Sequence, residues 1–224
     1  LEGLGELQVA QGVLVVDAPG LGLGVRLDEV DVRLRVDGPR VRAAARAWMV
    51  PGVSPLDIVA ELDRDSGDGR AWLALRDADL SAWSELRAAG IAPRSGTGRL
   101  DAWAELRGHR VASVVTRGEL DGLRLRGGGD GGAREVDLGT LAVDARWGAV
   151  EGGWRLDARR LQVGAGEDAQ VLDGLLLADG ARRALVAERI DAGGLLALLP
   201  LAPGLPPALA DWLVATRPDA VLHE

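Results

Sequence analysis

The chain has 224 residues, of which 47% are hydrophobic and 27% charged, and it contains no Cys, Phe or Tyr. This length is sufficient to bury a substantial core, and the composition is typical of a globular protein. The formal net charge of −8 argues against a nucleic-acid-binding surface, which would need a basic patch.

The N-terminal quarter of the chain predicts strands. Residues 4–16 predict one or two strands around a turn at Gln11-Gly12, and Pro19–Gly24 predicts a loop. The clearest strand covers Val25–Asp37, because apolar and charged residues alternate along it with period two. Its apolar face contains Val30, Val32, Leu34 and Val36.

The segment Ala71–Arg110 predicts a strand, a short helix near 79–89, and a second strand. Asp79 is a candidate N-cap, and Gly90 and Pro93 predict the end of the helix and a linker. Alternation before and after the helix assigns these apolar residues to one face of each strand: Leu73, Leu75, Leu100 and Leu106.

Two tryptophans in this segment, Trp72 and Trp103, share the faces of their strands with charged residues. Two interpretations are open: the indoles contact a helix on the outer side, or a bulge shifts the register. The acidic turn at Asp63–Gly69 and the turn at His109 lack the spacing of metal ligands. Both are predicted to be solvated turns, and no metal site is expected.

The C-terminal half predicts further strands and then two short helices. Val143 and Leu156 lie on the apolar faces of two alternating segments, and shorter strands are expected near 161–163, 175–177 and 184–190. The helices are expected at 191–199 and 208–215. Both are shorter than the roughly 20 residues that a membrane-spanning helix needs.

About a dozen strands joined by Gly-rich turns predict a mainly β fold with a mostly antiparallel meander sheet. Such a sheet has one apolar face to cover. A sandwich of two sheets, a closed barrel, and a long curved sheet with an open hydrophobic groove would each satisfy this requirement. The alternation of residues does not choose among them.

The order of several motifs resembles the AsmA-like family, in particular its YhdP-type members. The motifs are Ala78–Trp83, Ser95–Trp103, Arg117–Leu123, Gly153–Leu156 and Ala187–Leu195, and the likeness extends from about Trp48 to the C-terminus. The resemblance implies an open β-groove, with residues 1–224 as one segment of a longer periplasmic chain anchored in the inner membrane. It also implies transfer of phospholipids toward the outer membrane.

The leading functional hypothesis is therefore a non-catalytic lipid groove whose apolar face shelters acyl chains. Its expected partners are phospholipids, adjacent segments of the same longer chain and other envelope proteins. The alternative is a structural β-domain that docks a partner protein in the cell envelope. The expected groove-lining residues are Val30, Val32, Leu34, Val36, Leu73, Leu75, Leu100, Leu106, Val143 and Leu156.

An enzyme is not expected. The chain has two His and no Cys, Lys or Tyr, and no Ser lies in a G-x-S-x-G sequence. No motif for a cofactor is present. Paired carboxylates for glycoside chemistry stay open, because the acidic residues are numerous.

Overall fold

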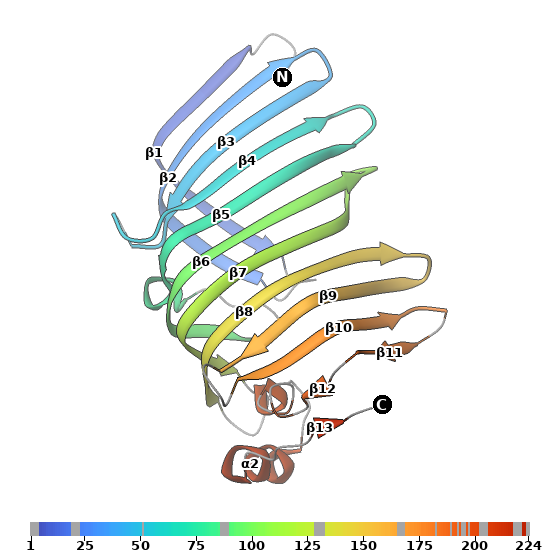
Figure 1. The fold of residues 1–224 in the computed structure, drawn as a ribbon. Helices are drawn as coiled ribbons and strands as arrows, with labels where there is room; N and C mark the ends of the chain where they lie inside the picture. Colours follow the sequence, from blue (N-terminus) through green and yellow to red (C-terminus); the bar gives the residue numbers. More distant parts are fainter. Residues whose placement is uncertain are drawn as a thin grey trace.

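The computed structural model describes residues 5–18, 23–50, 52–85, 90–127, 133–164, 169–181, 183–188, 190–191, 193, 196, 198–201, 206–216 and 221–222. Within them the chain forms an 11-stranded sheet whose strands follow one another in chain order (Figure 1). The strands are β1 (Glu6–Ala18), β2 (Leu23–Asp37), β3 (Arg40–Trp48), β4 (Leu56–Asp63), β5 (Gly69–Asp79), β6 (Ala92–Arg107), β7 (Arg110–Gly127), β8 (Arg134–Val150), β9 (Gly153–Val163), β10 (Gln170–Asp179) and β11 (Ala184–Val186).

The remaining described elements are short. They are the 3-10 helices η2 (Leu80–Trp83) and η4 (Leu199–Leu201), the helix α2 (Pro207–Thr216), and a small sheet of β12 (Ile190–Asp191) and β13 (Val221–Leu222). All neighbouring strands of the large sheet are antiparallel, and β1 and β11 are its two edges. The prediction of a single curved antiparallel meander is confirmed, and the sheet is not closed into a barrel.

One face of the sheet is apolar across all the central strands, because the register aligns the apolar residues of each strand with those of the next. Three rows run from β2 to β10. The first is Val30, Ala47, Leu56, Leu75, Leu100, Gly118, Val143, Leu161 and Leu172; the second is Val32, Ala45, Ile58, Leu73, Ala102, Thr116, Ala145, Ala158 and Leu175; the third is Leu34, Ala43, Ala60, Ala71, Ala104, Val114, Trp147, Leu156 and Leu177.

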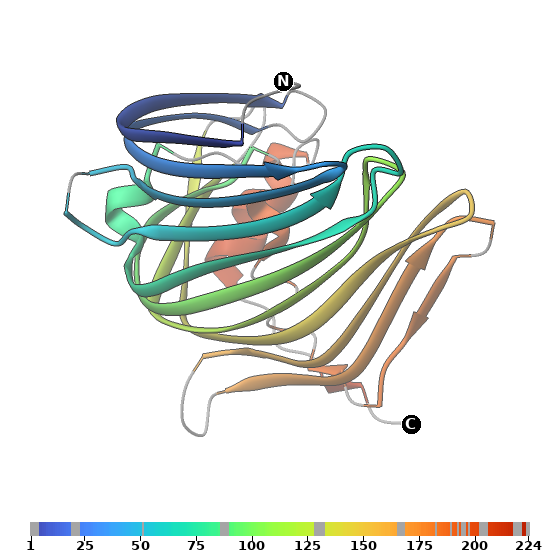
Figure 2. The ribbon, with the colours of Figure 1, turned by 90° about the horizontal axis from the view of Figure 1, so that it is seen from above.

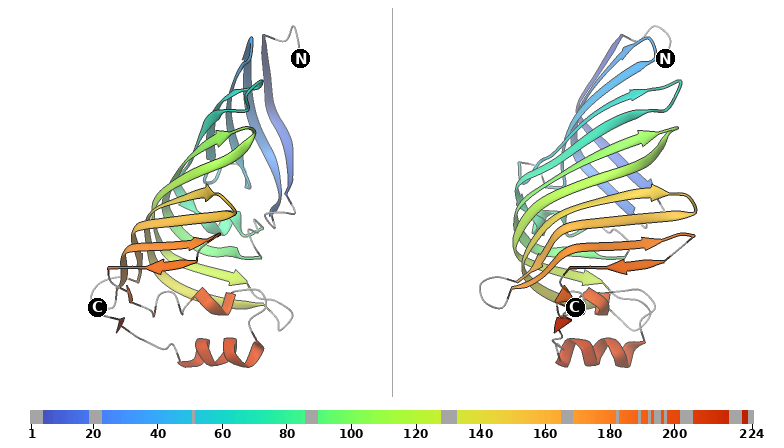
Figure 3. Two further views of the ribbon diagram at one scale, coloured as in Figure 1. Left: turned by 90° about the vertical axis from the view of Figure 1, so that its right-hand side faces the viewer. Right: turned by 45° about the vertical axis from the view of Figure 1, so that its right-hand side comes forward.

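The sheet bends near the first row, so that it has a U shape when viewed along the stack of strands (Figure 2). Register shifts occur there in β1 around Gly12, in β5 between Leu75 and Ala78, and in β7 between Leu120 and Leu123. A bulge adds one residue to one strand and bends it. The concave side carries the apolar rows, and the C-terminal helical segments lie at the lower end of the stack (Figure 3).

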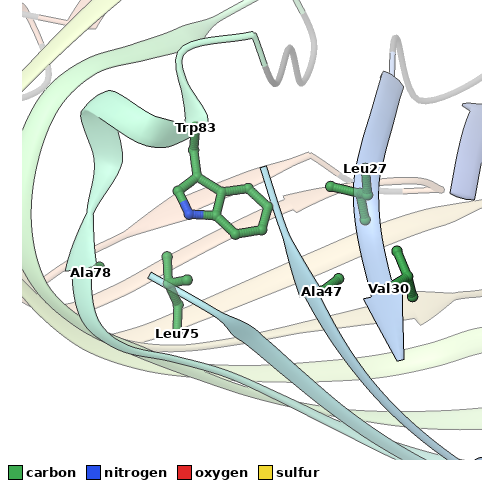
Figure 4. Packing of buried hydrophobic residues seen from close by; sticks show 6 residues of the cluster. All are labelled: Leu27, Val30, Ala47, Leu75, Ala78 and Trp83. Atoms are coloured by element: carbon green, nitrogen blue, oxygen red, sulfur yellow. The ribbon is translucent and has the colours of Figure 1, made fainter. Parts of the chain in front are cut away.

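The core is concentrated at the bend. Strands β3 and β4 end beside the first row, whereas β2 and β6 continue past it, and η2 fills the interval between them. Trp83 of η2 is only 4% exposed, and its indole lies between Leu75 and the β2 residues Leu27 and Val30 (Figure 4). A second cluster places Leu201 of η4 against β7, β8 and β9, with Leu120, Leu123, Val136, Leu138 and Val163.

Two predicted interruptions of strands are absent. Of the one or two strands predicted at 4–16, the structure has one, β1, in which Gln11 has a positive φ and forms a bulge and not a turn; its N–H donates to the carboxylate of Asp31. The segment around Pro93 belongs to β6. Pairing with β5 begins only at Thr97, so the missing N–H of Pro93 faces no β5 partner.

The helix predictions were met in part. Asp79 is the N-cap of η2, its side chain accepting from the Ser81 N–H at 3.0 Å, but the described helix is a single 3-10 turn. Residues 86–89 lie outside the described part. The predicted helix at 208–215 is confirmed as α2. In the helix predicted at 191–199, Asp191 instead belongs to β12. Of 192–198 the structure describes 193, 196 and 198, which are helical, and η4 follows from Leu199.

Candidate functional site

All ten residues predicted to line a groove lie on the concave apolar face. Val30, Leu75, Leu100 and Val143 belong to the first row, Val32 and Leu73 to the second, and Leu34 and Leu156 to the third. Val36 and Leu106 follow on the same face by the period-two alternation of β2 and β6. The register therefore gathers into one surface residues that are far apart in the sequence.

Burial divides this surface into a covered part and an accessible part. At the bend Val30 is 2% exposed, because η2 and β2 pack together there. Away from the bend, Leu34, Val36, Leu73 and Leu106 are only half-buried. Apart from neighbouring strands, the described elements with the most extensive backbone contacts to the sheet are η2, η4 and β12. They lie at the bend and the C-terminal end, so the second and third rows of β2–β6 form the accessible part.

The opposite face of the sheet is charged, and its charges alternate in sign from strand to strand on either side of β5. One row across β2–β10 reads Asp31, Arg46, Asp57, Ala74, Asp101, Arg117, Asp144, Arg160 and Asp173. Arg46 Nε lies 2.7 Å from Asp57 Oδ1, and Arg117 Nε lies 3.5 Å from Asp144 Oδ2. Opposite charges directly across a strand pair are favourable.

Hydrogen bonds shift the pKa values of two groups on this face toward the charged form. Asp57 accepts a hydrogen bond from Arg46 and raises the pKa of that guanidinium. Hydrogen bonds from Arg70 and then Arg42 hold the pKa of the Glu61 carboxyl below its ordinary value. Each exposed pair contributes little to the free energy of unfolding. Together they keep the outer face hydrated, so the two faces of the sheet differ sharply in polarity.

Trp72 and Trp103 lie on the charged face, directly opposite each other on β5 and β6. Neither of the two sequence-based interpretations is correct: no register shift lies between them, and they line a surface hollow instead of packing under a helix. Trp72 Nε1 donates to Asp101 Oδ1 at 3.2 Å, and the guanidinium of Arg76 lies 5.5 Å from its ring centroid. The period-two alternation predicts that both indoles lie on the charged face. The residues that they contact depend on the register of β5 and β6, which the alternation does not give.

The acidic turn is held by hydrogen bonds of its own, and the turn at His109 is hydrogen-bonded to it. Asp63 accepts from the Ser66 N–H and hydroxyl, which lowers the pKa of its carboxyl. A ring nitrogen of His109 lies 3.2 Å from the carbonyl oxygen of Arg64. Among the described residues, no group of three or more His, Cys, Asp or Glu is arranged to hold a metal ion.

None of the helices in the described part of the chain is long and apolar enough to cross a membrane. The fold and its two faces define a class of protein: a single-layer, open, amphipathic β-sheet with a concave apolar side. No family model matches the chain, and no curated protein or solved structure matches it significantly.

Proposed function

We propose that this chain is a non-catalytic segment of a lipid-transfer groove, in which the concave apolar face shelters phospholipid acyl chains. The supporting observation is that the apolar rows continue across the sheet while the part away from the bend is only half-buried. Contiguous apolar surface of this kind marks an interaction site in a folded protein. Head groups would stay at the open edge of the concave side, in water.

The dimensions and energies suit acyl chains. The apolar rows cross nine strands from β2 to β10, and eight spacings of about 4.8 Å give about 38 Å along the stack. The accessible part over β2–β6 spans about 19 Å of this length, compared with the roughly 15 Å hydrocarbon depth of one bilayer leaflet. Each methylene group removed from water contributes about 0.8 kcal/mol. An acyl chain lying along the rows would cross several strands. The charged outer face of the sheet would not bind it.

The resemblance to AsmA-like proteins supports the same proposal. On this basis we propose that the segment lies in the periplasm, within a longer chain anchored in the inner membrane, as a part of a bridge that carries phospholipids toward the outer membrane. The exposed Val13 and Val15 of the edge strand β1 favour docking of another strand there. We assign that edge to an adjacent segment of the same longer chain. An envelope partner protein at the same edge is the scaffold alternative.

Photo-crosslinking from adjacent positions of β2 tests the proposal. A photoreactive amino acid replaces Leu34 on the apolar face or Arg33 on the charged face, in the full-length parent protein in living cells. We expect phospholipid adducts from position 34 and none, or at least several-fold fewer, from position 33, because only the former lies in the third apolar row. Mass spectrometry of the purified protein identifies the adducts.

Position 33 is a matched control, since it lies on the same strand, next to position 34 and at the same distance from the sheet edge. Equal lipid adducts at both positions would indicate nonspecific membrane contact. Adducts at neither position, with protein crosslinks at both, would favour the scaffold alternative.

A further inference from the structure

The charged outer face contains one apolar strip, which has no part in the proposed lipid groove. The strip consists of Val59, Trp72, Trp103 and Val115, which are directly opposite one another on β4, β5, β6 and β7. They form the floor of a hollow of about 400 Å³, which we name the tryptophan hollow. Trp103 is 41% exposed, an unusual exposure for an indole in the middle of a sheet.

Polar side chains surround this floor. On one side, Glu61, Arg70, Glu105 and Ser113 form the next row across the same four strands. Arg146 of β8 lies opposite Val115 at the end of the strip. The hollow is thus lined by two carboxylates and two guanidinium groups, so its side chains carry no net charge.

Some of the polar groups are already paired and others are available to a ligand. Both carboxylate oxygens of Glu61 accept hydrogen bonds, from Arg42 at 3.3 Å and from Arg70 at 3.1 Å. Ser113 donates its hydroxyl to Oε2 of Glu105 at 3.2 Å. Within the described part of the chain, Arg146 has no ion-pair partner. Ser113 is itself only 6% exposed. The rim therefore offers Oε1 of Glu105 on one side and the guanidinium of Arg146 at the end.

We propose that the tryptophan hollow binds a neutral glycan. A pyranose ring has C–H groups on its faces, which pack on an indole, and hydroxyl groups around its rim, which both donate and accept hydrogen bonds. An apolar aromatic floor bordered by donors and acceptors matches that chemistry. Because the charges that line the hollow cancel, the lining itself favours neither an anion nor a cation. Across the strip, the guanidinium groups of Arg76 and Arg117 lie 5.5 and 6.0 Å from the ring centroids of Trp72 and Trp103.

The size of the strip argues against a protein partner. Stable protein interfaces bury roughly 800 Å² on each partner around an apolar centre. Here the strip has four large apolar side chains and is extended only by Ala44 beyond Val59, and a charged row such as Glu61–Arg70–Glu105 borders it. A hollow of about 400 Å³ is near the lower end of the range for small-ligand sites.

Titration of the ¹⁵N-labelled chain with maltotetraose, cellotetraose and chitotetraose tests this site. We expect at least one of these sugars to shift the indole N–H signals of Trp72 and Trp103 saturably, and to leave that of Trp212 on α2 unchanged. Trp103→Ala should weaken binding at least about tenfold, and Trp103→Phe should weaken it less, because a ring remains. Trp212→Ala is the matched control, since Trp212 is also exposed, at 51%, and its variant should bind as the wild type does.

Three results would overturn the proposal. The first is no indole shift with any of the sugars at ~10 mM, a concentration that populates millimolar complexes. The second is unchanged sugar affinity of Trp103→Ala when its circular dichroism matches that of the wild type. The third is a shift of Trp103 by a lysophospholipid and by no sugar, which would make the hollow a second lipid surface. The lipid groove is on the other face, so failure of one proposal leaves the other intact.

Discussion

At the scale of single residues, glycines determine how closely neighbouring strands approach. A Cβ added at Gly153, the first residue of β9, would overlap the carbonyl oxygen of Asp179. In the same hairpin, a Cβ at Gly148 of β8 would meet only the Ala112 carbonyl oxygen, at 3.8 Å. At Gly153 glycine is required because a side chain would clash with the backbone, whereas at Gly148 a methyl group fits. A comparison of the two positions therefore distinguishes this steric effect from the effect of glycine on the entropy of the unfolded chain.

We expect Gly153→Ala to lower the free energy of unfolding by about 1–3 kcal/mol, because backbone has to move to make room for the methyl group. Gly148→Ala should be neutral or raise it by up to about 1 kcal/mol, since the unfolded chain loses freedom. Urea unfolding measures both values. A Gly153→Ala variant as stable as the wild type would show that the contact at Gly153 relaxes without cost.

The faces of the strands could be predicted residue by residue from the sequence. Val30, Val32, Leu34 and Val36 needed only the period-two alternation, and the structure places them on one face. The partnership of Trp72 with Trp103 could not be predicted, because it depends on the lengths of the connections between β4, β5 and β6. The tryptophan hollow was missed for the same reason. The signal available in the sequence was the presence of two tryptophans on charged faces.

At the scale of elements, η2 occupies the space beyond the ends of β3 and β4, between β2 and β5. Trp83 Nε1 donates to the carbonyl oxygen of Ser54 at 3.2 Å, and Ser54 Oγ accepts from the N–H of Asp79. The loop before β4 is thereby joined to the end of β5. Because the indole also fills the space between β5 and β2, η2 is an integral part of the core despite its single turn.

Trp83→Ala is expected to lower the free energy of unfolding by about 3–5 kcal/mol, as for other large buried aromatic residues. Trp83→Phe keeps most of the packing and loses the hydrogen bond to Ser54, which costs about 1 kcal/mol and leaves a partial cavity. Chemical denaturation of the purified chain measures both. Trp212→Ala on the exposed side of α2 is the control and should change the value by less than about 0.5 kcal/mol.

Boundaries of elements were less predictable than their type. Pro93 was interpreted as part of a linker because proline cannot donate to a ladder. In the structure the first part of β6 pairs with β7 and extends beyond the end of β5. No strand lies on the β5 side of Pro93, so no backbone N–H is needed there to donate to a neighbouring carbonyl. Such an exception depends on the length of the neighbouring strand, which local sequence does not encode.

At the scale of the whole molecule, amphipathic alternation predicted a meander sheet, but it left open whether that sheet was single, paired or closed. Whether the sheet is single, paired or closed depends on its curvature. The curvature depends on bulges such as those at Gln11 in β1 and Asp77 in β5, two residues with positive φ. Bulges near the first row in several strands bend the sheet into a U. The concave side then becomes apolar because the register keeps the rows aligned.

Two adjacent alanines of β3 offer a direct test of whether the two faces act differently. Ala45 lies in the second apolar row between Val32 and Ile58, whereas Ala44 is exposed on the charged face opposite Arg33. An aspartate at position 45 would put a charge where an acyl chain is proposed to lie. Desolvation of a charge costs several kcal/mol, so we expect Ala45→Asp to weaken binding of palmitoyl-lysophosphatidylethanolamine at least about tenfold.

Ala44→Asp introduces the same charge one residue away, next to a guanidinium, and is expected to bind the lipid as the wild type does. Native mass spectrometry and the lipid-induced rise in the unfolding midpoint measure the binding, because a ligand that binds only the folded state stabilises it. The midpoints without lipid show whether each variant is folded. If both variants bind equally, or if both lose binding to the same extent, the concave face is not where the acyl chain lies. A loss confined to Ala45→Asp would tie lipid binding to the apolar rows, since the two substitutions differ only in the face of the sheet on which the carboxylate lies.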